Sequence, residues 1–410
     1  MKFDIKEWIG YLFYLVIGFF AASSFLNSYI VNITSFSFVE FLFLPVLYLR
    51  RKEIRRGCSI AIRKDGGLLF ISLIVLVALV AVGGVTSDGN VRGVLGGSRG
   101  YVYILFVGIY FRSNPLPGLY VLYALTLGAL LGDLALMLKG TFYGEVFRTA
   151  SDDVYKTNLM ALYLCVSASI LSRRVLLMLI VGAVSVIITV VGAFRINIAV
   201  MMIAILFGVL SSLKKVSVGG FFSLLIGLAL ASAVGFYTLG GLLNSGLLSK
   251  FGIFRIVDRT VALFSGDFYA SQDMSRLHAF YYIVDDAVNC MIPRGMAVKN
   301  TGGIFNDLPL YEVFYVFSIP LVVLLIIFAL YKTCSFYKCW LWGQLANQED
   351  GLILGFSVLA ILFLLANGRF LYIPYESIFY AMCIGRLFAS GENLRSYQGR
   401  PQMNRHHRRY

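Results

Sequence analysis

The stretch Leu242–Asp307 reads LLNSGLLSKFGIFRIVDRTVALFSGDFYASQDMSRLHAFYYIVDDAVNCMIPRGMAVKNTGGIFND, and it decides how the chain is organised. It is the only long polar interruption in a sequence that otherwise consists of apolar runs, and it holds six basic and six acidic residues. Apolar runs long enough to cross a membrane flank it on both sides. Such a stretch is either a plain extramembrane loop or a segment that roofs a site above a membrane cavity.

The composition of the rest of the chain predicts an all-α, polytopic membrane protein. Hydrophobic residues make up 59% of the 410 residues and charged residues only 14%, and the mean hydropathy is +0.82. Soluble globular proteins are far more polar than this. The composition therefore excludes an ordinary soluble enzyme or binding domain.

Apolar windows of about 20 residues predict about twelve transmembrane helices. These windows lie near residues 9–30, 36–49, 66–86, 100–112, 117–138, 157–172, 175–194, 196–213, 218–241, 308–331, 351–367 and 371–388. Residues 1–390 then form a single transmembrane domain, with one large loop (242–307) between spans nine and ten. Residues 391–410 are polar and basic, and we expect them to form a disordered cytoplasmic tail that touches anionic lipid.

The distribution of lysine and arginine predicts the orientation. With both termini inside, 22 of the 35 basic residues fall on the inner side, and six of the other 13 belong to the large loop. Long translocated loops count little in the positive-inside rule, so the bias favours cytoplasmic termini and an external loop. The same rule explains the net charge of +14 without a nucleic-acid partner. Six scattered cysteines and three histidines predict no metal site, and no cofactor is expected.

Two arginines are candidates for binding an anionic substrate. Arg195 sits between two apolar runs with almost no loop around it, where an arginine facing lipid would cost at least about 2.5 kcal/mol. It either snorkels to lipid headgroups or points into an external cavity, where its planar fork would bind phosphate. Arg276 lies in a loop segment with helical apolar spacing, so it either pairs with a local carboxylate such as Asp273 or faces substrate.

Carboxylates near or inside the apolar runs are the other candidates. Asp307 is the last polar residue before the tenth predicted span, where it acts either as a helix cap or as a general base. Asp133 and Glu40 lie inside apolar runs, where a charged residue is a functional candidate.

Several short motifs together resemble the O-antigen polymerase and O-antigen ligase superfamily. A span ends in an arginine that opens the next helix, as in Ala193-Phe194-Arg195, and a loop arginine opens a helix, as in Ser275-Arg276. A proline and glycine turn follows at Pro293-Arg294-Gly295. A polar motif at Asn306-Asp307 then precedes a helix that ends at Ser318-Ile319-Pro320, where the superfamily has glycine, isoleucine and proline. The likeness covers the topology and roughly residues 190–325.

The resemblance implies a glycosyltransferase of the bacterial inner membrane that needs no metal. A growing glycan on undecaprenyl pyrophosphate is transferred to a new lipid-linked oligosaccharide repeat unit on the periplasmic side. The resemblance implies Arg195, Arg276 and Arg294 as pyrophosphate-binding residues, with Asp307 as the candidate base. The partners it implies are the lipid-linked oligosaccharide, membrane lipid and a chain-length regulator protein.

One departure from the superfamily pattern favours a polymerase over a ligase. Ligases carry histidine eleven residues before the glycine place, and that position here is Asp307. The alternatives are an O-antigen ligase using His278, a lipid-linked oligosaccharide flippase or other transporter, and a scaffold protein whose loop holds no site. A transporter built from repeats would show matching halves, and this chain shows none by inspection.

Overall fold

A computed structural model describes residues 5–23, 45–64, 91–142, 157–192, 195–212, 281, 284–285, 287–293, 309–341, 349–366 and 374–389. All the regular secondary structure in these residues is helical, which confirms the all-α prediction. The helices are α1 (Ile5–Ala21), α4 (Arg51–Lys64), α6 (Val91–Ser113), α7 (Leu119–Phe142), α8 (Leu159–Leu171), α9 (Val175–Gly192), α10 (Arg195–Ser212), η1 (Asn289–Met291), α16 (Pro309–Phe317), α17 (Ile319–Leu341), η2 (Glu349–Leu352), α18 (Ile353–Ala366) and α20 (Pro374–Ala389).

Two of the described helices are long and apolar enough to cross a membrane, judged by length and composition. They are Leu119–Met137 within α7, with a mean hydropathy of 1.8, and α17, with 2.2. Four shorter apolar helices accompany them, at Ile9–Ala21, Leu159–Leu171, Val175–Thr189 and Ile196–Ser212. These findings agree with a membrane protein at a coarse level. The predicted spans near 66–86 and 218–241, most of the span near 36–49, most of the loop and the tail lie outside the described residues.

The outside of the helix bundle is apolar, and part of its interior is polar. On α17, Ile327 is 62% exposed, and on α9, Leu179 is 65% exposed. In contrast, Arg112, Asp133 and Asn197 are buried. Soluble proteins rarely expose contiguous apolar faces of this kind, so these surfaces are suited to contact with lipid.

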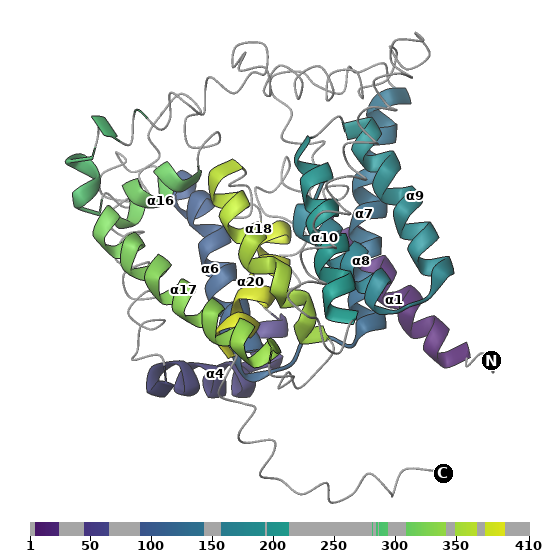
Figure 1. Cartoon of the computed structure of the whole chain (residues 1–410), viewed down its shortest axis with the longest axis horizontal. Coiled ribbons are helices and arrows are strands. Elements are labelled where there is room, and N and C mark those ends of the chain that lie inside the picture. The colour runs from purple at the N-terminus through teal and green to yellow at the C-terminus, as the bar shows by residue number, and fades with distance from the viewer. Residues whose placement is uncertain are drawn as a thin grey trace, which may run out of the picture.

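Contacts between helix ends show which ends lie together. The ring of Tyr11 near the start of α1 contacts that of Tyr120 in α7, with centroids 5.8 Å apart. Arg112 of α6 donates to the Phe388 carbonyl of α20, and Arg173 after α8 donates to the Ser212 carbonyl of α10. The starts of α1 and α7 and the ends of α6, α8, α10 and α20 therefore form one end of the bundle (Figure 1).

Basic residues gather at this end, which we call the basic end. They are Arg50, the basic residues of α4, Arg112, Arg173, Arg174, Lys338 and Arg386. The helix α4 lies crosswise to the other helices there, and α16 lies at the opposite end, which we call the outer end (Figure 1). The positive-inside rule predicts all of these basic residues on the cytoplasmic side, and the structure groups them at one end of the bundle.

Glycines let two helix pairs approach closely. A Cβ added at Gly18 of α1 would collide with the Leu125 carbonyl of α7, and one added at Gly128 of α7 would collide with Leu15 of α1. The same holds for α20 against α6, where Gly385 lies on the carbonyl of Gly108. Small residues at helix crossings allow this backbone contact, which supplies dispersion energy where lipid provides no hydrophobic drive.

The tenth predicted span, near 308–331, is wrong as a single helix. The chain forms α16 and then α17, which begins at Ile319 and continues to Leu341, so Lys332 and Lys338 lie within a helix. The break is at Ser318, whose φ is 78°. Pro320 has no N–H to bond to the carbonyl four residues earlier, so it favours a new helix start at this position.

We expect Ser318→Gly to stabilise the protein. A non-glycine residue with left-handed backbone costs roughly 1 kcal/mol, and glycine adopts that backbone freely. The measurement is the midpoint temperature of thermal unfolding of the purified protein in detergent, which should rise. Ser169→Gly, within the buried helix α8, is the matched control and should lower it. A fall in both variants would contradict the role assigned to the Ser318 backbone.

Candidate functional site

Of the sequence-predicted site residues, the structure describes only the backbone of Arg195, which belongs to the outer end of the bundle. Arg195 is the first residue of α10, so its backbone lies at the end opposite the basic end. The N-terminus of a helix carries a partial positive charge that favours anions. The side chain of Arg195 lies outside the described residues, as do Arg276, Arg294 and Asp307.

The described segments that flank two of these residues pack against each other. The η1 segment ends shortly before Arg294, and α16 begins two residues after Asp307. Cys290 of η1 is fully buried and forms an apolar cluster with Tyr311 and Tyr315 of α16. The chain on the N-terminal side of Arg294 is therefore anchored to the helix that follows Asp307. This cluster could not be predicted from the sequence, because a single cysteine in a polar loop does not reveal its partners.

The helix α16 is also fixed to the rest of the bundle. Its last residue, Phe317, makes an edge-to-face ring contact with Tyr101 of α6, with centroids 5.3 Å apart. Such aromatic pairs contribute about 0.5–1.5 kcal/mol beyond area burial. The helix that begins two residues after Asp307 is therefore held on the bundle at the outer end.

A buried polar network lies close to the start of α10. The Asp133 carboxylate of α7 accepts a hydrogen bond from the Asn158 backbone N–H at 2.8 Å. The Asn158 side chain caps α8 by accepting from Ala161 N–H at 3.0 Å, and it donates to the Ala22 carbonyl at 3.2 Å. All of these polar side chains are buried, with Asp133 only 1% exposed. The network joins α1, α7 and α8.

A second buried contact ties α10 to the same network. Asn197 lies two residues after Arg195, and its Nδ2 donates to the Thr157 hydroxyl at 3.2 Å. The Asn197 Oδ1 is buried and makes no hydrogen bond among the described residues. The residue next to Thr157 is Asn158, so the start of α10 is positioned by the helix cap that Asp133 supports. Sequence reasoning singled out Asp133 as a functional candidate, and the structure gives it the role of a positioning residue.

The basic end contains a buried ion pair that the sequence did not predict. Arg386 donates to Asp350 through Nε at 2.9 Å and through Nη2 at 2.7 Å, and its Nη1 lies 3.4 Å from the Asn114 carbonyl. Nearby, Glu349 accepts from the Leu119 N–H at 3.2 Å. Because both Asp350 oxygens are bonded to the guanidinium fork, this cluster acts as a clamp between α20, η2 and the α6–α7 connection. It leaves no carboxylate oxygen of Asp350 free for chemistry.

Titratable side chains of the kind that hold metals do not cluster in the described part of the chain. No group of three or more His, Cys, Asp or Glu side chains is placed there to share a metal ion. The six cysteines are all free thiols, and Cys165, Cys290 and Cys383 are buried.

We expect Asp133→Asn to be nearly neutral and Asp133→Leu to destabilise the protein. Asparagine keeps an oxygen that accepts from the Asn158 N–H, whereas leucine leaves that buried donor unsatisfied, which costs about 1–3 kcal/mol. The measurement is the unfolding midpoint in detergent at matched purity. Thr126→Val is the control in the same helix, because the Thr126 hydroxyl donates to carbonyls within α7 and its loss leaves the Asp133–Asn158 hydrogen bond in place. Equal losses from the Asn and Leu variants would show that the charge of Asp133, and not its acceptor oxygen, is what matters.

Comparison with known proteins identifies no relative. No protein-family model matches the chain, and no curated protein and no solved structure matches it significantly.

Proposed function

We propose that the chain is a polysaccharide polymerase of the bacterial inner membrane. It joins undecaprenyl-pyrophosphate-linked oligosaccharide repeat units into O-antigen or a related surface polysaccharide on the periplasmic side. The observation that carries the proposal is the backbone of Ser318, which has a φ of 78° at the position where the superfamily motif has glycine. Glycine adopts a left-handed backbone at little cost, so the φ of Ser318 supports the match of this position to the glycine of the motif.

The proposed topology has twelve spans with both termini in the cytoplasm. The grouping of basic residues at one end of the bundle supports this orientation, because cytoplasmic loops are enriched in lysine and arginine. The outer end then faces the periplasm, and it carries Arg195 and the segments that flank Arg294 and Asp307. This is the side on which lipid-linked repeat units would be joined.

The proposed reaction uses the arginines and one carboxylate. The non-reducing-end hydroxyl of the new unit attacks the anomeric carbon of the growing glycan, and its proton passes to Asp307. The bond between that carbon and the pyrophosphate oxygen breaks, and undecaprenyl pyrophosphate leaves with the electron pair. Arg195 and Arg276, with Arg294 as an auxiliary group, stabilise the negative charge on the leaving group through forked hydrogen bonds.

The glycan profile of a strain lacking this gene tests the proposal. We expect surface lipid that carries a single repeat unit, because the units are made and exported but not joined. The measurement is a gel ladder of surface glycan together with the lipid-linked intermediates. Long glycan retained on the undecaprenyl carrier would instead indicate a ligase. Absence of lipid-linked glycan on the periplasmic side would indicate a flippase, and an unchanged ladder would leave only a scaffold role.

Variants of the site residues test the roles assigned within that reaction. Arg195→Lys and Arg276→Lys keep the positive charge but lose the fork, so each should shorten the ladder nearly as much as alanine. Asp307→Asn keeps a residue that caps helices well, and it should still abolish polymerisation because it cannot accept the proton. The ladders are compared at matched membrane levels in the deletion strain. A wild-type ladder from the lysine variants would rule out phosphate binding by Arg195 and Arg276. A wild-type ladder from Asp307→Asn would rule out Asp307 as the base.

A further inference from the structure

The helix α4 is amphipathic, and its faces have different surroundings. Ile54, Gly57, Cys58 and Ala61 recur at helical spacing and are buried or half-buried. The opposite face carries the exposed basic residues Lys52, Arg56 and Arg63, and the exposed Arg51 and Arg55 lie at the border between the two faces. A helix with an apolar face and a basic face is suited to the interface between bilayer and water.

The end of α6 holds α4 in its crosswise position. A Cβ added at Gly57 would collide with the Ile109 carbonyl of α6, so the two backbones are in contact. The Ser113 hydroxyl at the end of α6 lies 3.4 Å from the Glu53 carbonyl. The helix is therefore docked on the protein at the basic end, and is not free to leave it for the lipid phase (Figure 1).

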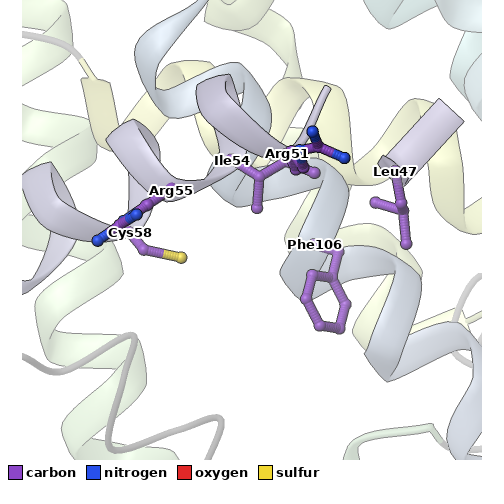
Figure 2. A pocket seen from close by; sticks show the side chains of 6 residues that line it. All are labelled: Leu47, Arg51, Ile54, Arg55, Cys58 and Phe106. Atoms are coloured by element: carbon purple, nitrogen blue, oxygen red, sulfur yellow. The ribbon is translucent and has the colours of Figure 1, made fainter. Parts of the chain in front are cut away.

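A pocket of about 410 Å³ opens between α4, the helical turn at residues 45–49 and α6. It is lined by Leu47, Arg51, Ile54, Arg55, Cys58 and Phe106. Figure 2 shows Leu47, Ile54 and Phe106 projecting into one open space, with the nitrogen atoms of Arg51 and Arg55 along its α4 edge. The volume lies within the range of small-molecule sites, roughly 300–1,000 Å³.

The two arginines of this pocket have no acidic partner in the described part of the chain. Glu53 is the one acidic residue of α4, and it pairs with Arg50 at 3.1 Å, outside the pocket lining. The pKa of Glu53 is lowered mainly by a backbone hydrogen bond to its carboxylate, and to a smaller extent by the hydrogen bond from Arg50. Arg51 stacks over the ring of Tyr48, 4.4 Å from its centroid, which orients its guanidinium plane. The positive charge of Arg51 and Arg55 is thus available to a ligand.

We propose that this pocket binds one anionic glycerophospholipid, with its phosphate on Arg51 and Arg55 and an acyl chain along Ile54, Leu47 and Phe106. Phe106 lies seven residues before the end of α6, about 10 Å further from the basic end at the rise of an α-helix. The charged and apolar parts of the pocket are therefore separated along the axis of α6, as are the headgroup and chain of a lipid. Guanidinium forks match phosphate oxygens in geometry as well as in charge.

Free phosphate and neutral lipid each fit only half of the pocket. Inorganic phosphate would use the arginines and leave Leu47, Ile54 and Phe106 exposed to water. A zwitterionic lipid would cover the apolar wall, but its own cation would compete with the arginines for the phosphate. The inference concerns the end of the bundle opposite the proposed catalytic residues, and it stands whether or not the chain is a polymerase.

The test is native mass spectrometry of the purified full-length protein in a neutral detergent, titrated with phosphatidylglycerol or phosphatidylcholine. We expect phosphatidylglycerol to bind at least about tenfold more tightly, because the choline cation of phosphatidylcholine offsets the phosphate charge and weakens its attraction to the two arginines. Arg51→Gln/Arg55→Gln should remove this preference. Arg56→Gln/Arg63→Gln removes the same charge from exposed positions of α4 outside the pocket lining, and it should keep most of the preference.

Equal losses in the two double variants would overturn the proposal, because they would show attraction to surface charge alone. Displacement of the lipid by equimolar inorganic phosphate would also overturn it, since the apolar wall would then contribute nothing. A second measurement uses the wild-type protein, so it is independent of any effect of substitution on folding. In nanodiscs, phosphatidylglycerol should slow alkylation of Cys58 relative to phosphatidylcholine and leave exposed Cys334 unchanged. An unchanged Cys58 rate would contradict occupancy of the pocket.

Discussion

Backbone contact at glycines is the constraint on which the described bundle depends. Gly18 and Gly128 bring α1 and α7 together, and Gly108 and Gly385 do the same for α6 and α20. In lipid there is little hydrophobic drive between helices, so association relies on close packing and on hydrogen bonds between helices. A side chain at Gly18, Gly128 or Gly385 would collide with the backbone of the facing helix and separate the two helices. The polar contacts at the helix ends would then lose their geometry.

Polar contacts between helices add to the close packing at the glycines. At the basic end, Arg112 reaches the last turn of α20, and Arg386 clamps Asp350. Towards the outer end, Asp133 and Asn158 connect α1, α7 and α8. Buried polar groups away from water are costly unless they are paired, so each joint also selects one arrangement of its helices. The outer surface needs no such pairing and remains apolar.

The two ends of the bundle are suited to different partners. The basic end carries exposed arginines, and the crosswise helix α4 gives it a pocket with one charged edge and one apolar wall. The outer end carries Arg195, the break at Ser318 and the cluster around Cys290. An anionic headgroup fits the first end, and a lipid-linked pyrophosphate is proposed for the second. Under both proposals, the protein would bind an anionic lipid at each end of the bundle.

The sequence by itself determined the helical class and predicted that basic residues gather at one end of the bundle, because both follow from local composition. Continuous apolar runs predicted the helices α7 to α10 within a few residues, apart from a longer C-terminal end of α7, since a helix satisfies its own backbone wherever it lies in lipid. The motifs around Arg195 and Asp307 also came from the sequence, and their assignment to a pyrophosphate site rests on resemblance.

Only the tertiary structure decided which residues meet. Asp133 reads as a functional charge in the sequence, and its role as a cap partner appears only when α8 is placed beside α7. The Arg386–Asp350 pair joins residues 36 positions apart, and the pocket beside α4 needs Phe106 from another helix. The break at Ser318 depends on a single φ angle that no hydropathy window contains. Periodicity reports the face of one helix, whereas such contacts depend on how several helices pack.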